Sequence, residues 1–234
     1  MPPSNGDAPT RTALITGATG GLGTATVAHF TEIGFRVIAA GRNRSSLTEL
    51  ADRFGPSVDT VVVDIADPDS VLEVAGQVGA VDVLVNNAGV LLTSDTDPST
   101  VDLKQVGEEF AVNTLGSWRM AQAVIPGMCH RGWGRVVNVS SGTASMHWGL
   151  RGGVPGYAVS KVALNAVTKL LASETRGTGV LVNALNPGRI KTPMMSEADR
   201  APEDAAADIG WAATLPENGP TGKFFRRSGE EMDW

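Results

Sequence analysis

Tyr157 and Lys161 are the two residues of this sequence whose types and spacing most directly suggest acid–base chemistry. They lie four positions apart in a segment with helical character, so their side chains share one helix face. A phenol has an ordinary pKa of about 10, too high for efficient proton transfer at neutral pH, and a neighbouring ammonium group lowers that pKa. The spacing alone also suits a half-buried tyrosine beside a surface lysine. Tyr157 is the single tyrosine of the chain, so no second phenol competes for the role.

A glycine-rich turn follows the first apolar segment, and its residues 16–23 read TGATGGLG. Glycines at a strand-to-helix turn let backbone N–H groups approach a pyrophosphate. The spacing GxxxGxG differs from both the GxGxxG fingerprint and the phosphate-binding P-loop. Glycines alone suit an ordinary tight connection equally well, but the position between the first strand and the first helix favours a nucleotide site.

The segment after the second expected strand indicates which nucleotide would bind. An NAD site places Asp or Glu about 20 residues beyond the glycines, whereas residues 39–44 contain no acid. Arg42 lies 19 residues after Gly23, and Arg42 or Arg44 would pair with a 2′-phosphate. Solvated loop arginines are the alternative, but the missing acid together with the arginine favours NADP(H) over NAD(H). Asp64 is a candidate acceptor for the adenine amino group, or a turn and capping residue.

Strands and helices alternate through the rest of the chain. Because the strands are mostly continuous apolar runs, they are typical of a parallel sheet buried on both faces. The pattern predicts an α/β fold, a single doubly wound Rossmann-type domain with a mostly parallel, about seven-stranded sheet and helices on both faces. The expected strands are Thr12–Thr16, Phe35–Ala40, Val58–Val63, Val81–Val85, Arg135–Val139, Val180–Leu185 and Thr221–Phe225. The expected helices are Gly21–Ile33, Ser45–Phe54, one from Pro68 capped by Asp67, 100–130 interrupted at Asn113–Gly116, Tyr157–Ser173 and Pro202–Leu215.

Length and composition bound the class of protein. The chain has 234 residues, which suits a flexible tail over 1–10 and one domain over 11–234. A net charge of −6 without a basic stripe argues against nucleic acid as a partner. Cys129 is the only cysteine, and no Cys/His cluster has the spacing of metal ligands, so we expect no disulfide and no metal. The start lacks signal-peptide features and no apolar run reaches membrane-helix length, so we expect a cytoplasmic protein without a membrane span.

Further polar residues follow the expected strands: Asn86-Asn87-Ala88-Gly89, Asn113, Ser140-Ser141 and Asn186-Pro187-Gly188. Together with the TGxxxGxG turn and the YxxxK pair, this order of motifs resembles the short-chain dehydrogenase/reductase superfamily. The resemblance spans about Thr12 to Arg227. The segments 138–142, 156–166 and 219–226 are similar to the carbonyl-reductase-like branch.

The resemblance implies a role for each matching residue. Tyr157 would donate the proton to the substrate carbonyl oxygen, and Lys161 would lower the pKa of Tyr157 and bind the nicotinamide ribose. Ser141 would orient the carbonyl, and Asn113 would hold a water in the proton relay. The implied cofactor-binding residues are Thr16, Gly17, Thr19, Gly20, Gly21, Leu22, Gly23, Arg42, Asp64, Ile65, Asn87, Ala88, Gly89, Tyr157, Lys161, Pro187, Gly188, Ile190 and Thr192.

The chain departs from the family pattern in its loops. Ser141 and Tyr157 are 16 positions apart, about three more than is common in the family, which lengthens the loop 142–156 and keeps Ser140 as a lesser candidate. His147 is expected to be a loop residue without a catalytic role, because Tyr157 already fills the role of proton donor. Five apolar residues of the loops suit either a wall of the substrate pocket or simple loop packing: Met146, Trp148, Leu150, Met194 and Met195.

These features predict an NADPH-dependent oxidoreductase that reduces a ketone or aldehyde, or performs the reverse oxidation. The partner is then a small carbonyl or alcohol substrate with an apolar portion. A non-catalytic NADP(H)-binding regulator on the same fold is the alternative, but it has little need of the four catalytic positions. An isomerising or dehydrating enzyme that acts on nucleotide sugars is a third hypothesis. It is disfavoured because such relatives in the superfamily usually carry TGxxGxxG and a larger C-terminal substrate domain, for which this chain is too short. The resemblance leaves homodimer, homotetramer and monomer open.

Overall fold

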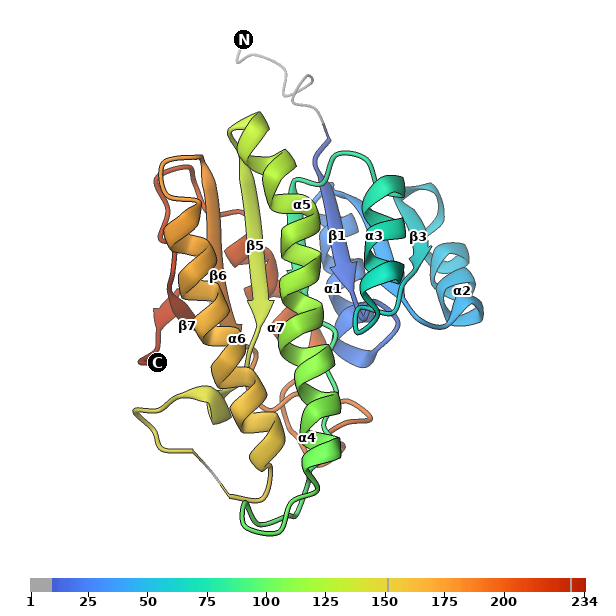
Figure 1. The fold of residues 1–234 in the computed structure, drawn as a ribbon. Helices are drawn as coiled ribbons and strands as arrows, with labels where there is room; N and C mark the ends of the chain where they lie inside the picture. The colour runs from blue at the N-terminus through green and yellow to red at the C-terminus, as the bar shows by residue number, and fades with distance from the viewer. Residues whose placement is uncertain (1–9, 151, 228) are drawn as a thin grey trace.

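The computed structural model describes residues 10–150, 152–227 and 229–234, and Figure 1 shows their arrangement. Nearly all of the expected N-terminal tail therefore lies outside the described residues. Within them the strands form one eight-stranded sheet in the order β3-β2-β1-β4-β5-β6-β7-β8. The strands are β1 (Thr12–Thr16), β2 (Arg36–Gly41), β3 (Val58–Val62), β4 (Val83–Asn86), β5 (Gly134–Val139), β6 (Val180–Asn186), β7 (Phe224–Arg226) and β8 (Glu230–Glu231).

The strands pair in parallel from β3 to β7, and only β7 and β8 run antiparallel within the described chain. The expected Rossmann-type sheet is therefore confirmed. The eighth strand was missing from the prediction because Glu230–Glu231 is short, exposed and acidic, without the apolar pattern that marks a strand.

Helices cover both faces of the sheet, as Figure 1 shows. One apolar cluster joins the sheet to α3, α5 and α6 through residues such as Val71, Met120 and Val167, and the other joins it to α1, α2 and α7. Leu14 belongs to the first cluster and its neighbour Ile15 to the second, because successive strand side chains point to opposite faces. The helices are α1 (Gly21–Glu32), α2 (Arg44–Phe54), α3 (Pro68–Gln77), α4 (Leu103–Phe110), α5 (Ser117–Arg131), α6 (Pro155–Glu174) and α7 (Pro202–Ala213).

Most boundaries agree with the sequence to within a few residues, and Asp67 caps α3 by accepting from Asp69 N at 3.0 Å. The expectation of a continuous apolar strand fails for β3, where Asp59 and Thr60 are exposed because β3 is the sheet edge. The interruption expected at Asn113–Gly116 is instead a π-helical turn, Ala111–Gly116, that joins α4 directly to α5. Such a wide turn is frequent at functional sites, and here it buries Asn113.

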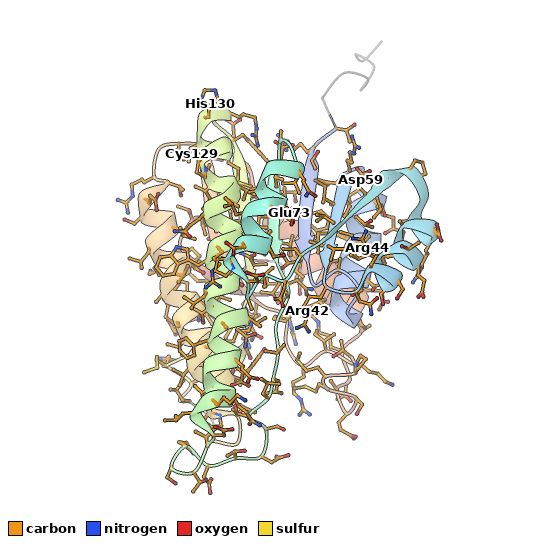
Figure 2. All side chains as sticks on the ribbon, turned by 45° about the vertical axis from the view of Figure 1, so that its right-hand side comes forward. Arg42, Arg44, Asp59, Glu73, Cys129 and His130 are labelled. Carbon is orange, nitrogen blue, oxygen red and sulfur yellow. The ribbon has the colours of Figure 1, made fainter. Side chains whose placement is uncertain are left out.

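The carboxyl ends of the central strands meet at one edge of the sheet, toward which the strand arrows of Figure 1 point. The order of strands reverses between β1 and β4, and open α/β sheets bind ligands at such a switch point. Figure 2 shows Arg42 at this end of the sheet, whereas Cys129 and His130 lie at the opposite end. The topology thus separates the single cysteine from the edge where a site is expected.

Candidate active site

A cavity of about 610 Å³ opens at the carboxyl ends of β1, β2, β4, β5 and β6. Its wall contains both serines that follow β5, Ser140 and Ser141, and all but one of the residues expected to bind cofactor. These lining residues are Gly17, Thr19, Gly20, Gly21, Leu22, Gly23, Arg42, Asp64, Ile65, Asn87, Ala88, Gly89, Tyr157, Lys161, Pro187, Gly188, Ile190 and Thr192. Two site residues, Thr16 and Asn113, lie outside this wall.

Thr16 is buried and does not line the cavity, but its hydrogen bonds fix the shape of the cavity wall. The Thr16 hydroxyl accepts hydrogen bonds from Asn87 N and Ala88 N, both at 3.1 Å. In return, Asn87 Nδ2 donates to Thr16 O at 2.9 Å and to Gly17 O at 3.1 Å. Thr16 therefore joins the glycine-rich turn to the end of β4, and the expected contact of Thr16 with the cofactor stays a prediction.

The glycine-rich turn presents free backbone donors to the cavity. At Gly23 an added Cβ would overlap Gly17 O, so the first turn of α1 approaches the end of β1 closely only because Gly23 lacks a side chain. The N-cap Gly20 supplies no side-chain acceptor. Among the described residues the N–H groups of Gly21 and Leu22 also have no hydrogen-bond acceptor. A helix N-terminus with free N–H groups fits a pyrophosphate, so the residues present suit a dinucleotide.

Arg42 and Asp64 border the cavity beyond the glycines. The exposed Arg42 guanidinium makes no ion pair or hydrogen bond with any residue that the structure describes. Arg44 begins α2 and does not line the cavity, and Figure 2 shows the two arginines apart. The Asp64 carboxylate accepts from Ala66 N at 3.0 Å, which fixes the turn after β3. Of the two expected 2′-phosphate candidates, only Arg42 faces the cavity.

Tyr157, Lys161 and Ser141 come together in the deeper part of the cavity. The Lys161 ammonium lies 5.7 Å from the centre of the Tyr157 ring, one turn along α6. It is 3% exposed and donates to Val139 O, at the end of β5, at 2.8 Å. The Ser141 hydroxyl lies close enough to the Tyr157 phenol to lower the pKa of Tyr157, and it accepts from Thr143 N and Thr143 Oγ1 at 3.2 and 3.0 Å. The structure therefore assembles three of the four expected catalytic side chains.

Burial is the largest influence on the pKa values of Tyr157 and Lys161. It raises the pKa of Tyr157 to about 12, with a further increase from the negative charge of Glu109, while the hydrogen bond with Ser141 acts in the opposite direction. Burial lowers the pKa of Lys161 to about 8. Desolvation of the phenol therefore dominates the net shift, and the expectation that Lys161 lowers the pKa of Tyr157 stays a prediction. Tyr157 holds its proton at neutral pH, which suits a donor.

The two serines after β5 have different surroundings. Ser140 is buried, and its hydroxyl donates to Asn165 Oδ1 of α6 at 2.6 Å. Ser141 points toward Tyr157 instead, and a short 3-10 turn over Gly142–Ala144 follows it. The longer loop between Ser141 and Tyr157 therefore leaves Ser141 in place, and Ser140 anchors the loop to α6.

Asn113 is fully buried in the π-helical turn. Its Oδ1 accepts from Val90 N at 2.8 Å, and its Nδ2 donates to Val90 O at 2.9 Å and to Ser160 Oγ at 3.0 Å. These bonds hold the segment after β4 against α6, close to Lys161. The expected role of Asn113 in holding a relay water stays a prediction.

A family model described as short chain dehydrogenase matches residues 11–203, which is most of the chain. The chain belongs to this family. It is 37% identical over 213 residues to the 1-deoxy-11-beta-hydroxypentalenate dehydrogenase of Streptomyces exfoliatus, covering 87% of this chain and 76% of that one. It is 37% identical over 198 residues to the L-xylulose reductase of Bos taurus, covering 84% and 79%.

Among solved structures, the NADPH-bound carbonyl reductase from chicken fatty liver matches with a TM-score of 0.86 at 26% identity, covering 96% of this chain and 99% of that one. Membership of the short-chain dehydrogenase family supports an oxidoreductase that acts on a CH–OH or C=O group. The solved relative supports a nicotinamide cofactor.

Thr93 and Glu109 also support the candidate active site, although the sequence analysis did not single them out. Glu109 is completely buried on α4, and its carboxylate accepts from Leu92 N at 2.6 Å and Thr93 N at 3.1 Å. At Gly156, immediately before Tyr157, a Cβ would overlap Glu109 Oε2. The one signal in the sequence is that Glu109 lies four residues before Asn113, so both share a helix face.

The apolar loop residues that were candidates for the pocket wall fall into two groups in the structure. Met194 and Met195 line the cavity, which confirms the pocket-wall interpretation for them. Met146, Trp148 and Leu150 are exposed and do not line it. His147 is exposed too, with Nε2 3.6 Å from Asp233 Oδ2.

The described residues contain no group of side chains suited to a metal ion, and none of their helices combines the length and apolarity that a membrane crossing requires.

Proposed function

We propose that the protein reduces a ketone or aldehyde to an alcohol with NADPH, or catalyses the reverse oxidation. The observation that carries this proposal is the arrangement of Ser141, Tyr157 and Lys161 in the same cavity as the free N-terminus of α1. When bound, the nicotinamide supplies the hydride for the carbonyl carbon. Every other requirement of the reaction falls to side chains of this chain.

Tyr157 supplies the proton that the carbonyl oxygen takes up. Its raised pKa keeps the phenol protonated at neutral pH, so the proton is available when negative charge develops on that oxygen. Ser141 lies within hydrogen-bond reach of the phenol and orients the same oxygen. The carbon–oxygen double bond thus gains a hydride at carbon and a proton at oxygen.

Lys161 holds the cofactor ribose and stabilises the phenolate once the proton has left. An ammonium group has three donors, and Val139 O takes one of those of Lys161. The others have no acceptor among the described residues and are available to a ribose hydroxyl and to the phenol. Because Lys161 is buried, its charge acts in an environment where water screens it little.

The preference for NADP(H) rests on Arg42. Its guanidinium borders the cavity without a partner among the described residues, and no acidic side chain occupies residues 39–44. A free guanidinium forms charge-assisted, bidentate hydrogen bonds with a phosphate. An NAD-type site would present a carboxylate here, which would repel the 2′-phosphate.

The test combines NADPH binding with turnover on a broad panel of ketones and aldehydes, followed by the loss of NADPH absorbance. Tyr157→Phe should lower kcat by about 10²–10⁴-fold and keep NADPH affinity, because the phenyl ring preserves the packing but has no proton to give. Absence of both NADPH binding and turnover in the unmodified protein would refute the proposal. Full activity of Tyr157→Phe would refute the role of Tyr157.

A further inference from the structure

A second cavity, of about 280 Å³, lies beside the candidate active site and is rich in arginine. We call it the arginine pocket. Its wall includes Trp148, Gly188, Arg189, Arg200, Arg226 and Arg227. The protein as a whole carries a net charge of −6, so four guanidinium groups around one small cavity run against its overall charge.

The arginine pocket adjoins the expected position of the substrate. Gly188 lines both this pocket and the larger cavity that contains Ser141 and Tyr157. Asn186 also lines the arginine pocket, and its Nδ2 lies 3.1 Å from the place where a Cβ on Gly142 would stand, next to Ser141. A substrate whose carbonyl contacts Ser141 therefore has the arginine pocket within reach of its remaining atoms.

Two of the four arginines are already neutralised and fixed. Arg200 pairs with Asp208 and donates to Pro187 O. Arg226 pairs with Glu230, and its guanidinium lies 5.3 Å from the centre of the Trp148 ring. These contacts hold the walls of the pocket in place and leave the positive charges of the other two arginines available.

The other two arginines, Arg189 and Arg227, are exposed and form no ion pair or hydrogen bond with the part of the chain that the structure describes. The carboxylate of Asp199 also lines the pocket and offsets one of these two charges. A net positive charge therefore remains, presented by guanidinium groups whose planar donors match the oxygens of a carboxylate or phosphate.

We propose that the arginine pocket binds an anionic group of the substrate, a carboxylate or a phosphate, and that Arg189 and Arg227 supply the donors. This inference rests on the proposed function, because it assigns the charged end of the molecule whose carbonyl is reduced. A cavity of about 280 Å³ has room for one such group. Met194 and Met195 line the larger cavity, so the substrate has an apolar stretch between its carbonyl and its anionic end.

The main experiment compares ketone substrates that differ only in charge. A series of methyl-ketone carboxylates of increasing chain length is assayed beside the corresponding methyl esters and beside ketones that carry a phosphate group. We expect one chain length at which kcat/KM for an anion exceeds that for the neutral ester by about tenfold or more, the size typical of a hydrogen bond to a charged group. Comparison of carboxylate with phosphate identifies which anion the pocket prefers.

The double variant Arg189→Gln with Arg227→Asn should abolish this preference for the anion. Asn suits position 227 because the backbone there has φ of 44°, a region that Asn tolerates. The matched control is Arg176→Gln, which removes an exposed arginine between α6 and β6, at the far end of the sheet, and should leave the anion-to-ester ratio unchanged. Equal kcat/KM for acid and ester in the unmodified protein, or a preference that survives the double variant, would overturn the proposal.

A binding measurement separates failure of this inference from failure of the proposed function. Succinate and inorganic phosphate are titrated into the unmodified protein and the double variant, and the fluorescence contributed by Trp148 is obtained by comparison with Trp148→Phe. Saturable binding that the double variant lacks supports the pocket even if no ketone is reduced. No difference between the two proteins overturns it even if ketone reduction is confirmed.

Discussion

The Thr93 hydroxyl lies within hydrogen-bond distance of both carboxylate oxygens of Glu109, at 3.2 and 3.0 Å. An ionised carboxylate only accepts, so the hydroxyl donates to it and keeps its own lone pairs for other donors. Gly156 N and Tyr157 N donate to Thr93 Oγ1 at 3.1 and 3.4 Å. The N-cap of α6 has no side-chain acceptor of its own, so Thr93 caps α6 from a distant segment of the chain.

Thr93→Val should destabilise the protein by about 1–3 kcal/mol, because it leaves a buried N–H group of α6 without an acceptor and removes the hydroxyl donor to the Glu109 carboxylate. Urea unfolding measures the change in the free energy of unfolding. Thr93→Ser keeps the hydroxyl and should recover most of the loss. A Thr93→Val protein as stable as the unmodified one would show that the cap contributes nothing.

Ser141→Ala should lower kcat by about 10²-fold or more, since a donor to the developing charge on oxygen is lost. Ser140→Ala is the matched variant one position away. It removes the hydrogen bond to Asn165, so its main effect should be a loss of about 1 kcal/mol of stability. Steady-state kinetics and urea unfolding of both variants separate the two roles, and the reverse pattern would assign the carbonyl to Ser140.

NADPH affinity should weaken as the pH rises through about 8, because burial lowers the pKa of Lys161 to about 8 and its positive charge is lost above that value. The dissociation constant measured by fluorescence between pH 6 and 10 (about two units either side of this pKa) tests the assignment. In Lys161→Met the affinity should be weaker throughout and lack this step. A step that persists in Lys161→Met would belong to another group.

The contributions of Lys161 and Tyr157 to the free energy of unfolding should respond to pH in opposite directions. Lys161 has a folded pKa of about 8 against an ordinary 10.5, so the unfolded chain binds more protons between these values and this group makes stability rise with pH there. Tyr157 has a folded pKa of about 12 against an ordinary 10.0, so its contribution is lost as pH rises from 10 to 12. Urea unfolding of Tyr157→Phe should show a shallower fall above pH 10 than the unmodified protein.

The sequence was sufficient for features that are local in the chain. Buried strands such as Thr12–Thr16 show continuous apolar residues, and the glycine-rich turn and the Tyr157–Lys161 pair are short motifs. Their order along the chain identified the family and the edge of the sheet where they meet. Hydrophobic periodicity and motif spacing predict such local features because each depends on residues that lie within a few positions of one another.

Features built by distant contacts were not predictable in this way. Thr93 and Gly156 are 63 residues apart, and neither belongs to a recognisable motif. The pKa of Tyr157 depends on how deeply α6 packs, which the four-residue spacing to Lys161 does not contain. The arginine pocket likewise combines residues from the loop 142–156, the segment after β6 and the end of β7.

Arg42→Ala should weaken NADPH binding by about 10- to 100-fold, the value of one or two hydrogen bonds between a guanidinium and a phosphate. NADH affinity should change little, because NADH lacks the 2′-phosphate that the guanidinium would contact. Arg44→Ala is the matched control, because Arg44 is also exposed but does not line the cavity. Dissociation constants of both nucleotides for the three proteins decide the assignment. If Arg44→Ala rather than Arg42→Ala alters the NADPH-to-NADH ratio, the helix α2 contacts the phosphate; if neither does, the preference for NADP(H) has no basis in these arginines.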